Sequence, residues 1–190
     1  MKFLFLLSAI LLAGCAGGPP PAWQANAKHS LDSFQRAYLR GDTRVADIEF
    51  TRAKSELAST GNAALVARAE LVRCATRAAS LEFDTCPAFE KLRADAGAEE
   101  ISYADFLAGR AARAAADDPL SRLVYSAVQF KSGKATPESI SSAVDISSAQ
   151  GWRRPLLAWL AVQEKRAEAS GDRATLEYVR RRISLTLEKN

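Results

Sequence analysis

The sequence predicts an all-α protein of about nine helices, stacked as antiparallel αα-hairpins. Apolar residues from position 23 onward recur every three or four residues, the period of one helix face, and almost no stretch alternates with the period of a strand. Glycine recurs where these apolar faces end, and Asp, Asn, Ser or Thr often stands where the next one begins. The connections are short, so consecutive helices are expected to run antiparallel.

The first three expected helices are separated by repeated stop and start signals. Gly41 ends the first helix, 23–40, and Asp42 caps the second, which continues to 58. Gly61-Asn62 repeats this signal, and the third helix is expected to end near Leu81. The residues predicted to face inward are Trp23, Ala27, Leu31, Phe34, Tyr38, Ala46, Phe50, Ala53, Leu57, Leu65, Ala69, Val72, Ala75 and Ala79.

The later helices carry stronger start signals. Pro87 starts a short helix, and Ser102 with Asp105 resembles a capping box. Asp118-Pro119 and Thr136-Pro137 each place a capping residue before a proline at the first helical position. The residues predicted to face inward here are Phe89, Leu92, Phe106, Leu107, Ala111, Ala114, Leu120, Leu123, Val124, Ala127, Val128, Ile140, Val144, Ser147, Leu156, Leu160, Ala161, Leu176, Val179, Ile183 and Leu187.

Residues 1–14 read as an export signal. Lys2 is followed by an apolar run from Phe3 to Leu12, which is too short to span a bilayer because a spanning helix needs about 20 residues. The segment closes on Leu12-Ala13-Gly14-Cys15, which resembles the lipobox of bacterial lipoproteins residue for residue. This resemblance implies signal-peptidase recognition of the first three residues, cleavage before Cys15, and a lipid on the Cys15 thiol. The alternative is a core cysteine that follows a signal peptide.

A short tether is expected to join the lipidated cysteine to the helical domain. Residues 15–22 include Gly17-Gly18-Pro19-Pro20-Pro21, and the prolines favour a stiff extended chain of about 20 Å. The helical domain is expected to cover 23–190. Ala16 rather than Asp follows Cys15, and similarity to the sorting pattern of enteric lipoproteins implies the outer membrane, on its periplasmic side.

The charge of the chain gives no sign of nucleic-acid binding. Without residues 1–14, the chain has 25 Lys and Arg against 22 Asp and Glu, a mildly basic balance. The densest basic run is Arg180-Arg181-Arg182, which is too short to indicate nucleic acid and is expected to be a solvated helix face. A contact with anionic lipid or with a partner is the alternative for this run.

Two further cysteines are candidates for a disulfide. Cys74 and Cys86 form an even pair in a chain expected to be exported. The chain can return from the expected helix end near Leu81 to Cys74, because each extended residue spans ~3.3 Å. Two free, buried thiols are the alternative.

One helix pair resembles a tetratricopeptide repeat. Ala37-Tyr38, then Gly41-Asp42, followed by Ala46, Phe50 and Ala53, match the middle of that repeat, where two helices pack around an aromatic residue. Phe34 stands where the family has Gly, and Ala58 where it has Pro. Arg166-Ala167 with Gly171-Asp172 matches Arg36-Ala37 with Gly41-Asp42. The alternative is a generic helical bundle with glycine caps.

Residues suited to catalysis are scarce. His29 is the single histidine, so a two-histidine metal site is excluded, and it is expected on a helix surface. Glu99-Glu100 and Asp117-Asp118 are the adjacent acidic pairs, and both stand at expected helix starts, where acids favour the helix dipole. No cofactor beyond the lipid on Cys15 is expected.

The sequence therefore favours a non-enzymatic, membrane-anchored lipoprotein that binds another envelope protein. Similar lipoproteins with tetratricopeptide-like domains act as assembly factors and pilotins. Trp and Arg are frequent interface anchors, which makes Trp152, Arg153, Arg154 and Trp159 candidate partner contacts, although Trp at helical spacing also suits a core. The alternative function is an envelope enzyme that acts on cell-wall glycan through Glu99 or Glu100.

Overall fold

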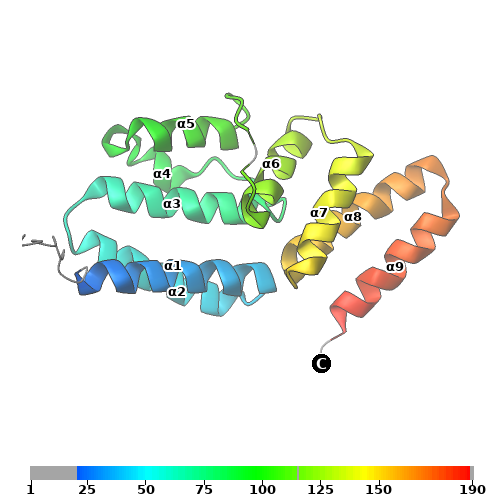
Figure 1. The fold of residues 1–190 in the computed structure, drawn as a ribbon, viewed down its shortest axis with the longest axis horizontal. Helices are drawn as coiled ribbons and strands as arrows, with labels where there is room; N and C mark the ends of the chain where they lie inside the picture. The colour runs from blue at the N-terminus through cyan, green and yellow to red at the C-terminus, as the bar shows by residue number, and fades with distance from the viewer. Residues whose placement is uncertain (1–20, 115, 189–190) are drawn as a thin grey trace, which may run out of the picture.

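The computed structural model describes residues 21–114 and 116–188. The lipobox, Cys15 and most of the tether lie outside the described residues. The described chain is all-α, as predicted (Figure 1), with nine α-helices and one short 3-10 helix, Arg93–Asp95. The helices are α1 Ala22–Arg40, α2 Thr43–Ala58, α3 Ala63–Ala78, α4 Pro87–Glu90, α5 Ala98–Leu107, α6 Pro119–Lys131, α7 Pro137–Ala149, α8 Arg153–Ser170 and α9 Arg173–Leu187. None of these helices is long and apolar enough to cross a membrane.

The α1–α2 hairpin forms as its sequence predicts. Gly41 ends α1 with φ of 96°, a left-handed conformation that glycine adopts without strain. Asp42 caps α2, because its carboxylate accepts a hydrogen bond from the Val45 N–H at 3.0 Å. Phe34 and Phe50 meet between the helices with ring centroids 5.2 Å apart. Phe50 is therefore a core residue of this hairpin.

The α8–α9 hairpin uses the same turn at the other end of the chain. Gly171 is left-handed, and the Asp172 carboxylate accepts from the Thr175 N–H at 3.0 Å. Across the hairpin, Arg180 of α9 contacts Glu164 and Glu168 of α8 at 2.7 and 2.6 Å. The first arginine of the basic run thus pairs with two carboxylates across the hairpin, while its side chain remains 55% exposed to solvent.

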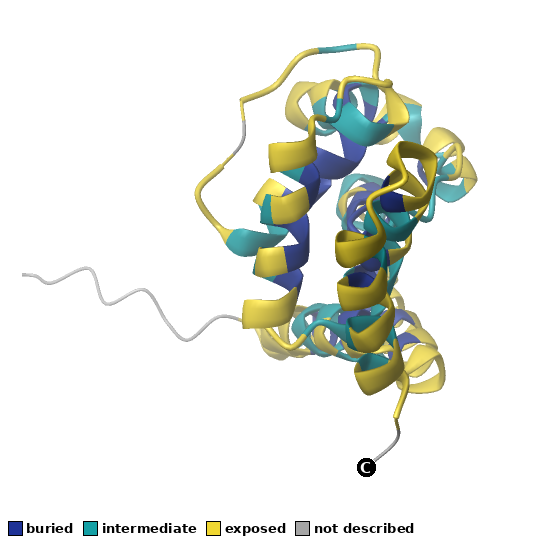
Figure 2. Ribbon diagram, turned by 90° about the vertical axis from the view of Figure 1, so that its right-hand side faces the viewer, coloured by how far each residue is buried: buried dark blue, intermediate teal, exposed yellow. Residues whose placement is uncertain are grey.

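The helices form two connected groups. In Figure 1, α3 lies between the α1–α2 hairpin and α5, and α7, α8 and α9 extend to one side. One core cluster joins α1, α2 and α3, and a larger one runs from α3 through α6 and α7 to α8. The buried residues face these clusters and the outer helix faces are exposed (Figure 2). Helix α3 contributes to both clusters, which explains its wide apolar face.

The start and end of α5 differ from the prediction. The helix begins at Ala98 after Gly97, and Ser102 and Asp105 lie inside it. It ends at Leu107 because Gly109 is left-handed, and the Arg110 N–H returns to the Asp105 carbonyl at 2.8 Å. Ala111 and Ala114 were predicted to lie on the inward face of a helix, but they lie in an irregular connection instead. Alanine's high helix propensity does not outweigh this turn.

Helix α3 also ends earlier than expected. Its last residue is Ala78, and Leu81 adopts φ of 60°, which stops the helix. The chain then turns back along α3, and this return brings Cys86 beside Cys74.

Candidate functional site

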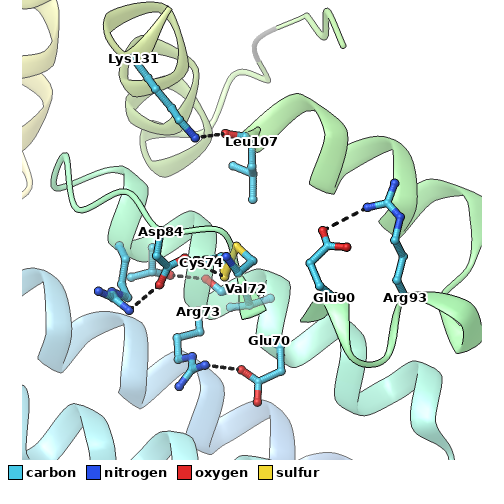
Figure 3. Close-up of a disulfide and its surroundings, with 12 residues drawn as sticks. Glu70, Val72, Arg73, Cys74, Asp84, Glu90, Arg93, Leu107 and Lys131 are labelled. Carbon is cyan, nitrogen blue, oxygen red and sulfur yellow. Dashed lines mark hydrogen bonds and ion pairs between the residues drawn. A yellow bond between two sulfur atoms is a disulfide. The ribbon is translucent and has the colours of Figure 1, made fainter. Parts of the chain in front are cut away.

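The cysteine pair forms the predicted disulfide. Cys74 on α3 and Cys86 at the start of α4 have Cα atoms 5.9 Å apart (Figure 3). Asp84 shapes the connecting loop, because its carboxylate accepts from the Cys86 N–H at 2.8 Å and pairs with Arg77 at 2.7 Å. The bridge fastens a loop that otherwise has little regular structure.

This loop also holds a group of metal-ligand atom types. The Asp84 carboxylate and the sulfurs of Cys74 and Cys86 lie within 4.8 Å of one another. The two sulfurs are bonded to each other, however, and a disulfide sulfur is not the thiolate that metals bind. The cluster is therefore structural in this state.

Trp159 belongs to the core, which removes it from the candidate partner contacts. Its side chain is fully buried, and its indole N–H donates to the Ala79 carbonyl at 3.1 Å. Phe130 packs edge-on against the indole with ring centroids 5.8 Å apart. This indole is therefore not accessible to a partner in the folded domain.

Arg154 and Trp152 join the two helix groups. The Arg154 guanidinium donates to the Tyr38 carbonyl at 2.8 Å and pairs with Glu82 at 3.2 Å. Trp152 is half-buried and packs against both core clusters. Arg153 is directed to the other side of α8, toward the Leu187 carbonyl at 3.5 Å. Arg154 and Trp152, which the sequence made candidate partner contacts, thus make contacts within the domain.

A groove lies between α3, α5, α6 and the connection that follows α5. Its volume is about 460 Å³, within the range of roughly 300–1,000 Å³ that is typical of ligand pockets. The groove is open on one side and has an apolar floor with a charged rim. Its charged and aromatic lining residues are Arg68, Glu99, Glu100, Tyr103, Phe106, Arg113, Asp118 and Tyr125.

Three aromatic residues line one side of this groove. Tyr103 and Phe106 of α5 have ring centroids 5.8 Å apart, and Phe106 stacks on Tyr125 of α6 at 6.4 Å. Arg113 lies over the Tyr103 ring at 5.2 Å. Burial raises the pKa of the Tyr103 hydroxyl, and the charge of Arg113 opposes this only in part. Tyr103 therefore stays protonated at neutral pH and can donate a hydrogen bond.

The acidic residues of the groove stand at helix starts, as predicted. Glu99 and Glu100 occupy the first turn of α5, and Glu100 lies 3.8 Å from Arg68. Asp118 caps α6 by accepting from the Ser121 N–H at 2.9 Å. Burial raises the pKa of Asp118, but hydrogen bonds from Ser121 and Leu120 outweigh it and hold the pKa below its usual value. Asp118 is thus ionised at neutral pH, and its carboxylate caps α6.

The sequence did not predict this groove. Arg68, Tyr103 and Tyr125 come from three helices, and no local spacing relates them. The only sequence signal was the pair Glu99-Glu100, which marks one wall. His29, by contrast, is exposed on α1, as expected of a surface histidine.

Comparisons of the chain with known protein families, with curated proteins and with solved structures gave no match.

Proposed function

We propose that this chain is a lipid-anchored, non-enzymatic interaction module of the bacterial envelope. The anchor is Cys15, and the lipobox resemblance at Leu12-Ala13-Gly14-Cys15 supports it. The absence of Asp at position 16 supports the outer membrane as the location. The module is the helical domain, which binds another envelope protein.

The groove between α3, α5 and α6 carries the binding part of the proposal. Tyr and Arg are enriched at protein interfaces because they combine apolar area with hydrogen bonds. Tyr103, Tyr125, Arg68 and Arg113 supply these groups around one opening. Glu99 and Glu100 add negative charge on the same rim. A segment of a partner with both apolar and charged side chains fits this lining.

The hairpin architecture supports a tetratricopeptide-like scaffold. The α1–α2 unit has the expected Gly-Asp turn, with Phe50 between the helices and Ala46 and Ala53 fully buried. Small residues at these positions let two helices approach closely. The α8–α9 unit repeats the turn, although Leu176 and Arg180 stand where Ala46 and Phe50 would be. We interpret the domain as one repeat-like hairpin followed by divergent ones.

A cross-linking experiment tests the binding site. A photoreactive amino acid placed at Tyr103 should capture one envelope protein stoichiometrically in living cells. Tyr125→Ala and Arg68→Glu should reduce this capture at least about tenfold, because interface anchors commonly contribute more than 1 kcal/mol each. The matched control is the same probe at Ser148, exposed on α7. Equal capture of the same protein at both positions would contradict the proposal.

Metabolic labelling tests the anchor. The wild-type protein should incorporate a radiolabelled fatty acid, and Cys15→Ser should abolish the label and leave unprocessed precursor. Alkylation of the wild-type thiol by maleimide in intact cells would show that Cys15 carries no lipid.

A cell-wall glycan-acting enzyme is the second candidate. It is motivated by the carboxylates of Glu99 and Glu100 on α5 and of Asp118 before α6, which line the same groove, since a glycosidase needs two carboxylates that face each other across a cleft. Such an enzyme should release soluble fragments from purified peptidoglycan and lose this activity in Glu100→Gln. The interaction module releases none, whether or not Glu100 is replaced by Gln.

A further inference from the structure

Most of the large apolar side chains that the described residues expose lie at one junction. Val45 and Ile48 on α2 are 38% and 45% exposed, and Leu185 and Leu187 on α9 are 68% and 54% exposed. The remaining one, Tyr178, is two helical turns before Leu185 on the same helix. We call the group Val45, Ile48, Leu185 and Leu187 the junction surface.

Two consecutive arginines at the start of α8 contact the two helices that carry the junction surface. Arg154 donates to the Thr43 hydroxyl at the start of α2. Arg153 reaches the Leu187 carbonyl at the end of α9. The first turn of α2 and the last turn of α9 therefore flank the first turn of α8, and Figure 1 shows these three helix ends near one another.

Both halves of the junction surface have basic helical neighbours, although acidic residues also stand one turn from Val45 (Asp42 and Glu49) and from Leu185 (Glu188). Arg44 and Arg52 stand four residues to either side of Ile48, and Arg181 and Arg182 stand one turn before Leu185. Arg44 and Arg181 are exposed and take part in no ion pair within the described chain. Basic residues that surround exposed leucine and isoleucine are typical of surfaces that contact anionic lipid.

We propose that the junction surface docks against the anionic surface of the membrane that anchors the protein. Val45, Ile48, Leu185 and Leu187 would enter the headgroup region, and Arg44 and Arg181 would contact lipid phosphates. The choice of membrane over another occupant rests on the proposed lipid anchor and on this charge pattern. The interaction gives the protein a second attachment and sets the orientation of the domain.

The length of the chain before α1 is compatible with this docking. Six residue steps separate Cys15 from Pro21, and an extended chain of that length spans at most ~20 Å. Helix α1 has 19 residues, so it is ~28 Å long, and the junction surface lies near its far end. An anchor at one end of the α1–α2 hairpin and the junction surface at the other would lay the hairpin along the membrane.

The test uses the mature chain with Cys15→Ser, so that binding occurs without the lipid. The protein is mixed with vesicles of phosphatidylcholine or of phosphatidylcholine and phosphatidylglycerol in equal parts, and the bound fraction is measured by sedimentation. Binding to the anionic vesicles should exceed binding to the neutral ones and should fall with salt. Reversing two charges in Arg44→Glu/Arg181→Glu should lower the partition coefficient at least about tenfold, since each basic residue near the surface contributes about fivefold.

Matched variants separate docking from general charge and from misfolding. Lys91→Glu/Lys134→Glu makes the same charge change at exposed positions on other elements and should bind as the parent does. Ile48→Ser/Leu185→Ser should weaken binding without lowering the melting temperature. In addition, Leu185→Trp should gain fluorescence quenching by brominated lipid beyond that of the parent.

Three outcomes would overturn the inference. Equal binding of the parent and of Arg44→Glu/Arg181→Glu would show that the junction surface is not used. Binding to neither vesicle, with a dimer in analytical ultracentrifugation that Ile48→Ser/Leu185→Ser abolishes, would assign the surface to a second copy. If Leu185→Trp binds the vesicles but brominated lipid quenches its fluorescence no more than that of the parent, the protein contacts the membrane through another surface. The fatty-acid labelling of wild-type Cys15 does not depend on any of these outcomes. The vesicle experiments therefore test membrane docking, and the labelling experiment tests the lipid anchor, independently of each other.

Discussion

Arg154 and Tyr38, which are 116 positions apart in sequence, form one compact contact. The Arg154 guanidinium donates to the Tyr38 carbonyl at 2.8 Å and also lies over the Tyr38 ring, 4.3 Å from its centroid. Burial, and then the nearby carboxylate of Glu82, raise the pKa of the Tyr38 hydroxyl, so the ring stays neutral and retains its attraction for the cation. This contact connects the N-terminal hairpin to the C-terminal helices.

Arg154→Ala should destabilise the domain by about 2–3 kcal/mol, because it removes hydrogen bonds made by a charged group and a cation–π contact. Arg154→Lys should recover only part of this loss, since a lysine cannot contact Tyr38, Glu82 and Thr43 at once. Urea denaturation measures both. Arg153→Ala is the control and should change the unfolding free energy by less than about 0.5 kcal/mol. Equal effects at both positions would show that Arg154 does not connect the two helix groups.

The helices and turns were predictable because their signals are local. Gly41-Asp42, Asp118-Pro119 and Thr136-Pro137 each place a stop, a cap or a proline within a few residues of the helix end that they determine. The boundaries of α5 were wrong because Asp105, which resembles a capping residue, binds the arginines Arg93 and Arg110 instead. The end of α5 is therefore set by a tertiary contact as well as by Gly109.

The groove and the contacts of the candidate interface residues were less predictable, because they depend on residues that are distant in sequence. Arg154 was one of the candidate partner contacts, yet its contacts lie on α1, α2 and the loop after α3, and no spacing on α8 indicates them. Trp159 likewise suited either an interface or a core by its residue type and spacing, and its full burial against Phe130 and the Ala79 carbonyl shows that it is a core residue. The disulfide was predictable because its two cysteines are close in sequence and a single turn separates them.

Removal of the Cys74–Cys86 disulfide should destabilise the domain by about 3 kcal/mol, because the bridge closes a loop of 12 residues in the unfolded chain. Cys74→Ala, Cys86→Ala and the double variant should show nearly the same loss, since each removes the same bond. Thermal unfolding of the exported protein measures this. Mass spectrometry without reduction should find the two cysteines in one linked peptide pair. Alkylation of both thiols in the exported protein would disprove the bridge.

Gly41→Val should destabilise the α1–α2 hairpin by about 1–2 kcal/mol. The cause is backbone strain alone, because a Cβ at Gly41 would meet nothing within 4 Å, whereas a β-branched residue strongly disfavours φ of 96°. Gly41→Asn should lose less, since Asn tolerates left-handed conformations. Unfolding midpoints of the three proteins give this ranking. An equal loss for Val and Asn would mean that the turn changes conformation in both.

Acid should destabilise the contacts that Asp105 of α5 makes with Arg93 before this helix and with Arg110 after it. One carboxylate oxygen of Asp105 lies 2.7 Å from Arg93 and 2.8 Å from Arg110, and hydrogen bonds from Arg110 and then Arg93 hold the pKa of Asp105 below its usual value. Because the folded pKa is depressed, the stabilisation is complete above the unfolded pKa of about 3.9 and is lost as the pH falls through the lower, folded value.

Asp105→Asn should therefore melt at a lower temperature than wild type near neutral pH. The difference should shrink as the pH falls below about 4 and disappear once Asp105 is protonated in the folded wild type. Calorimetry across this range measures both proteins. Asp145→Asn, which removes an exposed carboxylate on α7 that forms no ion pair within the described residues, is the matched control. A difference between wild type and Asp105→Asn that stays constant down to low pH would show that the charge of Asp105 does not stabilise this connection.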